Sequence, residues 1–456
     1  MEMNGKTEDY LNQLCSALRH DVPEHVVNRA KESLLDYLAC VYAGRYALDD
    51  RGKRLEAVAS FEKGAGLAIG LRSDLPAKEA AFLNGFFAHA LDFDDGVNRG
   101  IIHLGSPVFS VLLSLAAICG CTGKELLFAA IGGYEAAWTL ADTVQPNHKL
   151  RGYHATGTCG CVGAAFAGSL LLGFSADEIF RTVSTALVSA TGMLKVLDDA
   201  SELKPYNVAK AALLATTALQ VGKAGFEVPD DALGGVRGFL EMFAGSRDLA
   251  VTPPLSEGLY AIERTYTKPY AACRYCHPAI EAASLLGEEL GHDYSAIESI
   301  DVRTYDLAVR GHDHDGLDSP SSAKMSIPYG VAVAFLFGRA GLAEYEPSVH
   351  SDSRVAHLSR IVRVCSDSSY SEAFPVRTIA TVEVRTSIGE VVSRTVEFPK
   401  GEPENPLGST GVCSKFKELV AWSKMSDLWA SEVIDCVMHV EDCLPQLLEL
   451  LNGRTA

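Results

Sequence analysis

The sequence contains no long run of lysines and arginines, although the chain is 456 residues long. Its 40 basic residues are outnumbered by 58 acidic ones, and the formal net charge is -18. The electrostatic field of such a negative charge repels the phosphate backbone of nucleic acids and the anionic surface of membranes. We therefore expect neither nucleic acid nor a membrane as a partner, and an anionic substrate would need positive charge built into its own site.

We also expect no secretory leader, because the opening MEMNGKTEDYLNQL has no basic segment followed by an apolar one. The 12 cysteines are scattered along the chain, and several, such as Cys119, Cys121, Cys159 and Cys161, lie in apolar segments. This distribution is typical of reduced and mostly buried thiols. We expect a cytoplasmic protein.

Charged residues are absent from residues 152–175, a stretch that by length alone could span a bilayer. It is diluted by Gly, Thr, Cys and His154, and it lacks flanking basic clusters and aromatic belts. It therefore predicts a helix buried on all sides within a large helical domain. Since no glycine-rich loop follows a predicted strand, we expect no dinucleotide or phosphate cradle.

The length favours two domains, and the first of them is helical. From about residue 7 to 265, apolar residues recur at helical spacing. In HVVNRAKESLLDYLACVYAG this spacing continues up to Gly44, which we expect to end the helix. Further helices, apolar nearly all round and therefore packed on one another, are predicted at residues 108–119, 124–144, 162–172, 176–190 and 209–225.

After Lys268 the hydrophobic period changes to that of β-strands. Residues 299–305 (SIDVRTY) alternate, and TIATVEVRTSIGEVVSRTVEF predicts a β-hairpin that turns near Gly389. KGEPENPLG has the composition of a loop, and the sequence beyond it returns to helix. The predicted fold is mainly α, with a large all-helical domain (residues 1–265 and 405–456) and a smaller α+β domain (residues 266–404).

The stretch HALDFDDGVNRGIIHLGSPV places three carboxylates, Asp92, Asp94 and Asp95, between His89 and His103. The segments on either side are almost uncharged. A carboxylate cluster costs electrostatic repulsion and desolvation unless it is exposed, paired or used. Asp92 is therefore a candidate functional residue with a raised pKa or a cationic partner. The alternative is a solvated loop whose acids cap the next helix.

Two further polar segments stand at the start of apolar helices. RGYHATGTCG places His154 beside small residues, which let a ligand approach the backbone, at a helix N-terminus that favours an anion. LKPYNVAKAA brings Lys204 and Lys210 into an apolar region, and a substrate carboxylate is one way to neutralise a buried lysine. The alternatives are a core histidine with satisfied hydrogen bonds and lysines whose ammonium groups lie in water.

Two segments of the second domain add candidate residues. KPYAACRYCHPAIEAA gathers Lys268, Arg274 and His277 around two thiols at the head of a helix. SSAKMSIPYGVAVAFLFG places Lys324 and Tyr329 before another buried helix.

Three stretches offer metal ligands without the spacing of a known metal motif. GHDHDGLD is rich in oxygen and nitrogen donors but lacks the pattern of a calcium loop. Cys159 with Cys161, and Cys273 with Cys276, could be half-sites for zinc or an iron–sulfur cluster, but neither pair has a partner motif. Buried thiols account for both pairs, and we predict no metal.

Taken in this order, HALDFDD with a following histidine, GYHATGTCG, LKPYNVAKAA, KPYAACRYCHPAIEA, AKMSIPYGVA and KGEPENPL resemble the motifs of the MmgE/PrpD family. The resemblance covers nearly the whole chain, and the family includes 2-methylcitrate dehydratases, cis-aconitate decarboxylases and iminodisuccinate epimerases. It implies a large helical domain to which both ends of the chain contribute, and a smaller α+β lid. It also implies a homodimer and a cofactor-free site at the domain junction.

Carried over residue by residue, the resemblance implies a set of catalytic residues and a set that binds substrate. Family members often have a histidine shortly after the Lys204 position, where this chain has Tyr206 and Asn207. The catalytic candidates are Asp92, His103, His154, Lys204, His277 and Tyr329, and the substrate-binding candidates are Lys268, Arg274, Asp95 and Thr156.

The family reactions add or remove a proton or carbon dioxide next to a carboxylate, through an enolate-like or carbanion-like intermediate. Lys204, His103 and His277 could stabilise that charge, His154 could act as the base, and Asp92 could orient or charge a neighbouring histidine. We expect a lyase acting on a small di- or tricarboxylate, and we rank dehydration of a citrate- or 2-methylcitrate-like acid ahead of decarboxylation of a cis-aconitate-like acid. Two alternatives stay open: an epimerase or isomerase of an amino or imino dicarboxylate such as iminodisuccinate, and a non-catalytic scaffold that binds an acid metabolite.

Overall fold

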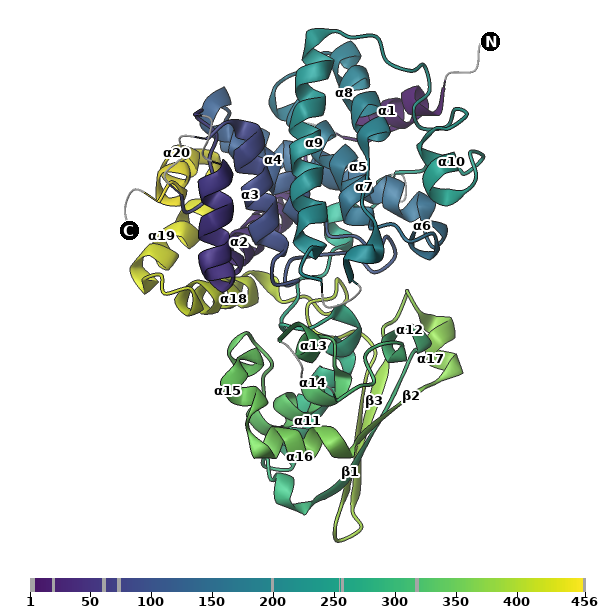
Figure 1. The fold of residues 1–456 in the computed structure, drawn as a ribbon, viewed down its shortest axis with the longest axis vertical. Helices are drawn as coiled ribbons and strands as arrows, with labels where there is room; N and C mark the ends of the chain where they lie inside the picture. The colour runs from purple at the N-terminus through teal and green to yellow at the C-terminus, as the bar shows by residue number, and fades with distance from the viewer. Residues whose placement is uncertain are drawn as a thin grey trace. The chain divides into compact units, whose positions relative to one another are not determined.

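The computed structural model describes residues 5–18, 21–59, 63–71, 75–197, 201–253, 255, 258–315 and 320–453. The chain divides into two compact units, Met1–Thr265 with Gly408–Ala456, and Tyr266–Leu407 (Figure 1). The first is built from helices, and the second combines helices with a four-stranded sheet. The predicted fold class, mainly α with a smaller α+β part, is confirmed.

The helical unit combines a long N-terminal part of the chain with its C-terminal helices. Its helices are α1 (Lys6–Ala17), α2 (Glu24–Ala59), α3 (Ala77–His89), α4 (Gly105–Cys119), α5 (Gly123–Val144), α6 (Asn147–Leu150), α7 (Ala155–Leu171), α8 (Ala176–Ser189), η1 (Leu194–Leu197), α9 (Lys204–Ala224), α10 (Phe239–Ala244), η3 (Ala261–Arg264), α18 (Gly408–Trp422), α19 (Asp427–Met438) and α20 (Val440–Leu451).

The five apolar helices predicted from hydrophobic spacing are present as α4, α5, α7, α8 and α9. Two of them begin five or more residues earlier than predicted, α7 at Ala155 and α9 at Lys204. Their first turns contain polar residues such as Thr156 and Asn207, which interrupt the apolar pattern. These early turns contribute to the candidate site described below.

Helix α7 packs against α4, α5, α8 and α9 and is buried along its length. Small residues allow this packing: a Cβ added at Gly163 would lie 2.5 Å from Cβ of Ala137 on α5, so only glycine permits this approach. The prediction that the uncharged stretch forms a buried helix is confirmed. Among the described residues, no helix has both the length and the apolarity needed to cross a bilayer.

Helix α2 does not end at Gly44, so this detail of the prediction was wrong. The helix continues to Ala59, with non-helical backbone angles at Asp49. Gly44 lies against the end of α3, where an added Cβ would be 1.9 Å from the carbonyl oxygen of Phe87. The glycine therefore serves a close helix crossing rather than a helix end.

The three C-terminal helices α18, α19 and α20 belong to the helical unit, and α18 and α19 pack on α2 (yellow and purple in Figure 1). A buried ion pair joins α18 to α2, with 2.5 Å between Nζ of Lys415 and Oδ1 of Asp36. The same ammonium donates to the carbonyl of Phe93 at 2.8 Å. The C-terminal segment thus supports the loop that carries the carboxylate motif.

The sheet of the α+β unit has the strand order β2-β1-β3-β4. Its strands are β1 (Ile297–Thr304), β2 (Val362–Ser366), β3 (Ala380–Thr386) and β4 (Val391–Val396), and β1 pairs parallel with β2 and antiparallel with β3. The predicted hairpin is confirmed as β3 and β4, with Gly389 in the turn at a φ of 86°. Strand β2 was not predicted, because it is short, largely exposed and directly continues a helix.

Helix α11 packs on β3, β4 and α14, which in turn packs on α16. The helices of this unit are η4 (Arg274–Cys276), α11 (His277–Glu289), η5 (Tyr294–Ala296), α12 (Asp306–Val309), α13 (Pro320–Lys324), α14 (Ile327–Phe337), η6 (Ala343–Tyr345), α15 (Pro347–His350), α16 (Ser353–Ile361) and α17 (Ser368–Ala373).

Candidate active site

The loop between α3 and α4 positions the carboxylates of the HALDFDD motif. Asp92 has a φ of 53°, in the left-handed region. This conformation costs a residue with a Cβ roughly 1 kcal/mol or more, although Asp tolerates it better than most. Backbone outliers of this kind cluster at functional sites. The Asp92 side chain meets two of the other predicted site residues.

Nζ of Lys204, the first residue of α9, lies 2.7 Å from Oδ2 of Asp92. Oδ1 of the same carboxylate lies 3.6 Å from Nε2 of His103. The side chains of Lys204 and Asp92 are 24% and 25% exposed, so this ion pair is reachable by a ligand while being partly shielded from solvent.

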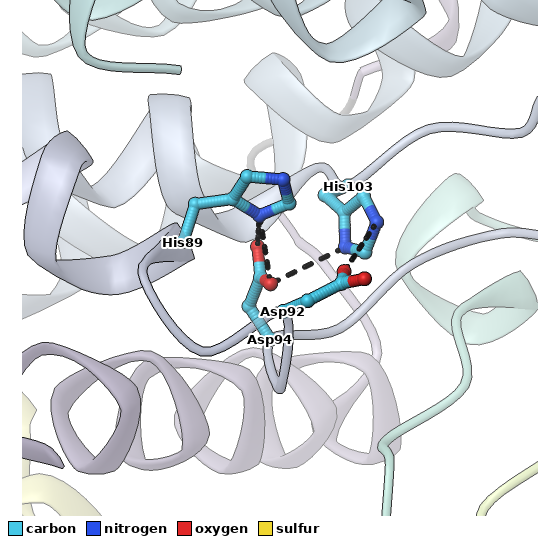
Figure 2. A group of neighbouring side chains, drawn as sticks. All are labelled: His89, Asp92, Asp94 and His103. Atoms are coloured by element: carbon cyan, nitrogen blue, oxygen red, sulfur yellow. Dashed lines mark hydrogen bonds and ion pairs between the residues drawn. The ribbon is translucent and has the colours of Figure 1, made fainter. Parts of the chain in front are cut away.

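Asp94 lies between two imidazole rings (Figure 2). Its Oδ1 is 2.9 Å from Nδ1 of His89 and 3.4 Å from Nδ1 of His103. The hydroxyl of Ser106 donates to Oδ2 at 2.5 Å. The His89 ring is 4.6 Å from the His103 ring and 5.8 Å from the His154 ring, measured between centroids. Three histidines therefore surround this part of the loop.

The His103 ring is oriented by the backbone. Its Nδ1 lies 2.7 Å from the carbonyl oxygen of Asp95, which can only accept, so Nδ1 carries a proton. Its backbone N–H donates to Oγ1 of Thr156 at 3.1 Å. Nε2 of His103 is left facing Asp92, and a positive charge on the ring would be compensated by the carboxylates of Asp92 and Asp94.

His154 is the N-cap residue of α7 and is buried. Burial, together with the nearby His89 and Lys204, lowers the pKa of His154 well below its usual value of 6.5, so its ring is neutral at neutral pH. The amide of Asn207 donates to Nδ1 of His154 at 3.4 Å and to the carbonyl of Met193 at 3.2 Å. An acceptor role for Nδ1 directs the ring proton to Nε2.

The Asp95 side chain is buried and forms hydrogen bonds with groups other than the neighbouring carboxylates. Its Oδ1 accepts from the backbone N–H of Gly105, and its Oδ2 accepts from the hydroxyl of Tyr134 at 2.6 Å. Burial raises the pKa of Asp95 to about 6. The carboxylate thus anchors the start of α4, and substrate binding by Asp95 stays a prediction.

One group of side chains in the described part of the chain has metal-ligand spacing: His89, Asp92, Asp94 and His103, whose ligand atoms lie within 4.8 Å of one another. Imidazoles and carboxylates could hold a divalent transition metal. However, the Lys204 ammonium already contacts Asp92, and hydrogen-bond donors already contact Asp94. The protein's own groups therefore already occupy the positions around both carboxylates.

Residues 316–318 of GHDHDGLD lie outside the described residues.

Other predicted site residues belong to the α+β unit, where Arg274 and His277 are buried and in contact. Nη1 of Arg274 lies 2.8 Å from Nδ1 of His277, and Nε2 of His277 donates to the carbonyl of Ala272 at 3.1 Å. The Arg274 guanidinium also forms an ion pair with Glu402. Both side chains are thus held by groups of their own unit.

Lys268 and Tyr329 are also buried in the α+β unit. The Tyr329 hydroxyl donates to the carbonyl of Glu344 at 2.6 Å, and burial raises the pKa of this phenol. Tyr329 is therefore a neutral donor already bound to the backbone. The catalytic roles of His277 and Tyr329, and the substrate contacts of Lys268 and Arg274, stay predictions.

The helical unit brings together Asp92, His103, Thr156 and Lys204, with His154 near His89. Sequence reasoning did not place His89, Asp94 or Asn207 among the site residues, although the first two belong to the HALDFDD motif. Two histidines flanking three acids within one short stretch could have indicated His89 and Asp94. Nothing local to LKPYNVAKAA indicates that Asn207 reaches His154.

This arrangement combines one partly exposed ammonium group, several imidazoles and a set of carboxylates that already contact cationic or hydrogen-bonding groups. An ammonium beside imidazole N–H groups can bind a carboxylate and stabilise negative charge that develops next to it. Imidazoles can also transfer protons near neutral pH.

Comparison with known proteins agrees with the motifs. Residues 11–252 match the MmgE/PrpD N-terminal domain, and residues 270–429 match the MmgE/PrpD C-terminal domain. The chain is 26% identical to a cis-aconitate decarboxylase of Aspergillus terreus, over 98% of this chain and 96% of that protein. It is 22% identical to the cis-aconitate decarboxylase of Mus musculus, over 99% and 94%. The 2-methylcitrate dehydratase of Salmonella typhimurium is 27% identical over 54% of each chain. The chain therefore belongs to the MmgE/PrpD family.

Proposed function

We propose that this protein is a lyase acting on a small polycarboxylate, with decarboxylation of a cis-aconitate-like acid as its reaction. The observation that carries the proposal is the Lys204–Asp92–His103 cluster beside the neutral His154 ring. The similarity to cis-aconitate decarboxylases along nearly the whole chain supports this choice over dehydration.

In such a reaction a carbon–carbon bond breaks and carbon dioxide leaves. The bonding electron pair moves into the conjugated system of the remaining dicarboxylate, which becomes enolate-like. A positive charge and N–H donors placed where this negative charge develops lower the barrier. In our proposal Lys204 supplies the positive charge and Nε2–H of His154 a hydrogen bond.

The carbanionic carbon must then take up a proton. His103 is our candidate donor, since a positive charge on its ring would be compensated by Asp92 and Asp94. After it gives up the proton from Nε2, the ring is neutral and is still held through Nδ1 by the carbonyl of Asp95. Solvent would restore the proton for the next turnover.

A second candidate reaction is dehydration of a citrate- or 2-methylcitrate-like acid, supported by the partial match to 2-methylcitrate dehydratases. It passes through a similar negative charge next to a carboxylate, but a hydroxyl group leaves instead of carbon dioxide. It therefore requires a base for a carbon-bound proton and an acid for the leaving group.

The cytoplasmic location and the homodimer stay predictions from composition and family resemblance.

Proton NMR of the purified protein in deuterated buffer tests the proposal, with cis-aconitate, citrate, 2-methylcitrate and iminodisuccinate each supplied alone. Vinylidene signals from cis-aconitate are the expected result, and a vinyl signal from a hydroxy acid would instead support dehydration. Deuterium exchange into iminodisuccinate without elimination would favour an epimerase. If none of these substrates reacts while the Aspergillus terreus relative is active in the same buffer, the proposal fails.

The matched control is Lys204→Met, purified in the same way. Because its fold should be intact while the positive charge is gone, loss of the product signals with this variant assigns the activity to the chain itself. Product formed equally by both preparations would reveal a contaminating enzyme.

A further inference from the structure

A second set of reactive side chains lies in the α+β unit, where Cys273 contacts His312. Sγ of Cys273 lies 3.2 Å from Nε2 of His312. Nδ1 of the same ring lies 3.0 Å from the carbonyl oxygen of Arg310. Because a carbonyl only accepts hydrogen bonds, Nδ1 carries the ring proton and Nε2 is the acceptor for the thiol.

This arrangement has the geometry of an activated nucleophile. A thiol donates to an imidazole nitrogen, and a third group fixes the orientation and tautomer of that imidazole. His312 is only 5% exposed, whereas Cys273 is partly exposed. The base is therefore held in place while the sulfur can be reached by a small reagent.

A second thiol stands three residues further along, at Cys276. The backbone N–H of Cys276 donates to the carbonyl of Cys273 at 2.9 Å, which closes a tight turn over these four residues. A turn of this kind brings its end residues within about 7 Å between Cα atoms, and disulfides form at Cα separations of about 4.4–6.8 Å. The two cysteines are thus close enough for a disulfide.

The surroundings give the two thiols different roles. Cys276 is buried, and burial raises the pKa of its thiol well above the usual value. It has no histidine contact like that of Cys273 among the described residues. Cys273 is therefore the thiol that reacts first, and Cys276 is available to react with the product.

We propose that Cys273 and Cys276 form a redox-active pair that is oxidised by hydroperoxides, with Cys273 as the attacking thiol, His312 as its base and Cys276 as the resolving thiol. The proposal does not depend on the function proposed above.

The chemistry balances with one hydroperoxide as the oxidant. His312 takes the Cys273 proton, the sulfur attacks a peroxide oxygen, and the oxygen–oxygen bond breaks. The leaving oxygen takes the proton from His312, so Cys273 becomes a sulfenic acid and the peroxide is reduced to water or an alcohol. The Cys276 sulfur then attacks the sulfenic sulfur, a disulfide forms, and the hydroxyl group leaves as water with the Cys276 proton.

The test compares thiols within the full-length wild-type protein. Cys365, an exposed cysteine on β2, serves as the internal reference, since the described residues give it no histidine contact. The reduced protein is treated with hydrogen peroxide, quenched by alkylation at timed intervals and analysed by peptide mass spectrometry. We expect Cys273 to be lost at least about tenfold faster than Cys365, with a Cys273–Cys276 disulfide as the product.

Two variants then test the assigned roles. Cys276→Ser should stop the reaction at the Cys273 sulfenic acid, which dimedone traps. His312→Asn can still donate to the Arg310 carbonyl but offers the thiol no base, so Cys273 oxidation should slow by about tenfold. Oxidation of Cys273 no faster than that of Cys365 in the wild-type chain would overturn the proposal, whether or not these variants fold. So would a Cys273 product that never includes a bond to Cys276.

Discussion

Lys204 holds its ammonium group 2.7 Å from the Asp92 carboxylate, which joins the first residue of α9 to the loop before α4. The other oxygen of this carboxylate faces Nε2 of His103 at 3.6 Å. Asp92 therefore orients a cation and an imidazole toward the same region. The pair is partly exposed, so a substrate carboxylate can approach the ammonium without a buried charge being left unpaired.

Replacing Lys204 with Met should lower kcat/KM by about a hundredfold or more, because it removes the group proposed to stabilise developing negative charge. The matched control is Lys223→Met, at the other end of α9, where an exposed ammonium lies 2.8 Å from Glu178. Exposed ion pairs contribute only about 0–1 kcal/mol to stability, so this variant should retain its activity and melting temperature. Equal kinetic losses in the two variants would count against a catalytic role for Lys204.

The buried neutral ring of His154 predicts a pH-dependent stability. Its folded-state pKa is lowered, so below about pH 6.5 the unfolded chain binds a proton that the folded chain does not. This residue therefore makes the free energy of unfolding fall as pH drops below 6.5, by up to about 1.4 kcal/mol per pH unit.

His154→Gln should reduce this slope between about pH 6.5 and 5 in urea denaturation. Between about pH 7 and 8 the histidine is neutral in both states, so the slopes of variant and wild type should coincide there. Identical slopes at low pH would show that His154 is protonated in the folded protein as well.

Asn207→Asp should raise the pKa of His154, because a carboxylate next to Nδ1 favours the protonated imidazole. The pH titration of the His154 ring, followed by NMR, measures this shift. Asn207→Ala separates the new charge from the lost hydrogen bond, since it should raise the pKa of His154 less than Asn207→Asp does. The same His154 titration in the Asn207→Asp variant and the wild type would mean that the two side chains are not in contact in solution.

The buried ion pair between Lys415 and Asp36 predicts a strongly non-additive pair of substitutions. Lys415→Met would leave the Asp36 carboxylate, whose pKa burial already raises, without its cation. We expect it to cost about 3–5 kcal/mol of unfolding free energy, measured by urea denaturation.

Adding Asp36→Leu to Lys415→Met removes the stranded charge and should recover a large part of this stability. Additive effects of the two substitutions would mean that the ion pair does not form in solution.

Gly44→Ala should destabilise the protein by about 2 kcal/mol or more, because the added Cβ would lie 1.9 Å from the Phe87 carbonyl oxygen. Helix α3 ends at His89, so the displacement should reduce turnover as well. Gly52→Ala, in the same helix, is the control: its nearest contact would be 3.3 Å, and alanine favours helix over glycine by about 1 kcal/mol. Similar melting temperatures for the two variants would contradict the close crossing of α2 and α3.

The amino-acid sequence by itself determined the features that depend on neighbours within one element. Hydrophobic period predicted α4, α5 and α8, and strand alternation around Gly389 predicted the hairpin, because each pattern is contained in a short segment. The order of motifs along the chain indicated the family. The clustering of acids and histidines in HALDFDD also marked the loop that holds Asp92.

Only the tertiary structure decided which of these groups meet. Gly44 lies within α2, where the absence of a Cβ allows α3 to cross closely. Strand β2 forms because β1 provides a parallel partner. Lys204 reaches Asp92 from a distant part of the chain. The tautomers of His103 and His312 depend on carbonyl groups that folding places beside their rings. Distances and hydrogen-bond directions between distant segments are set by packing, which no local pattern records.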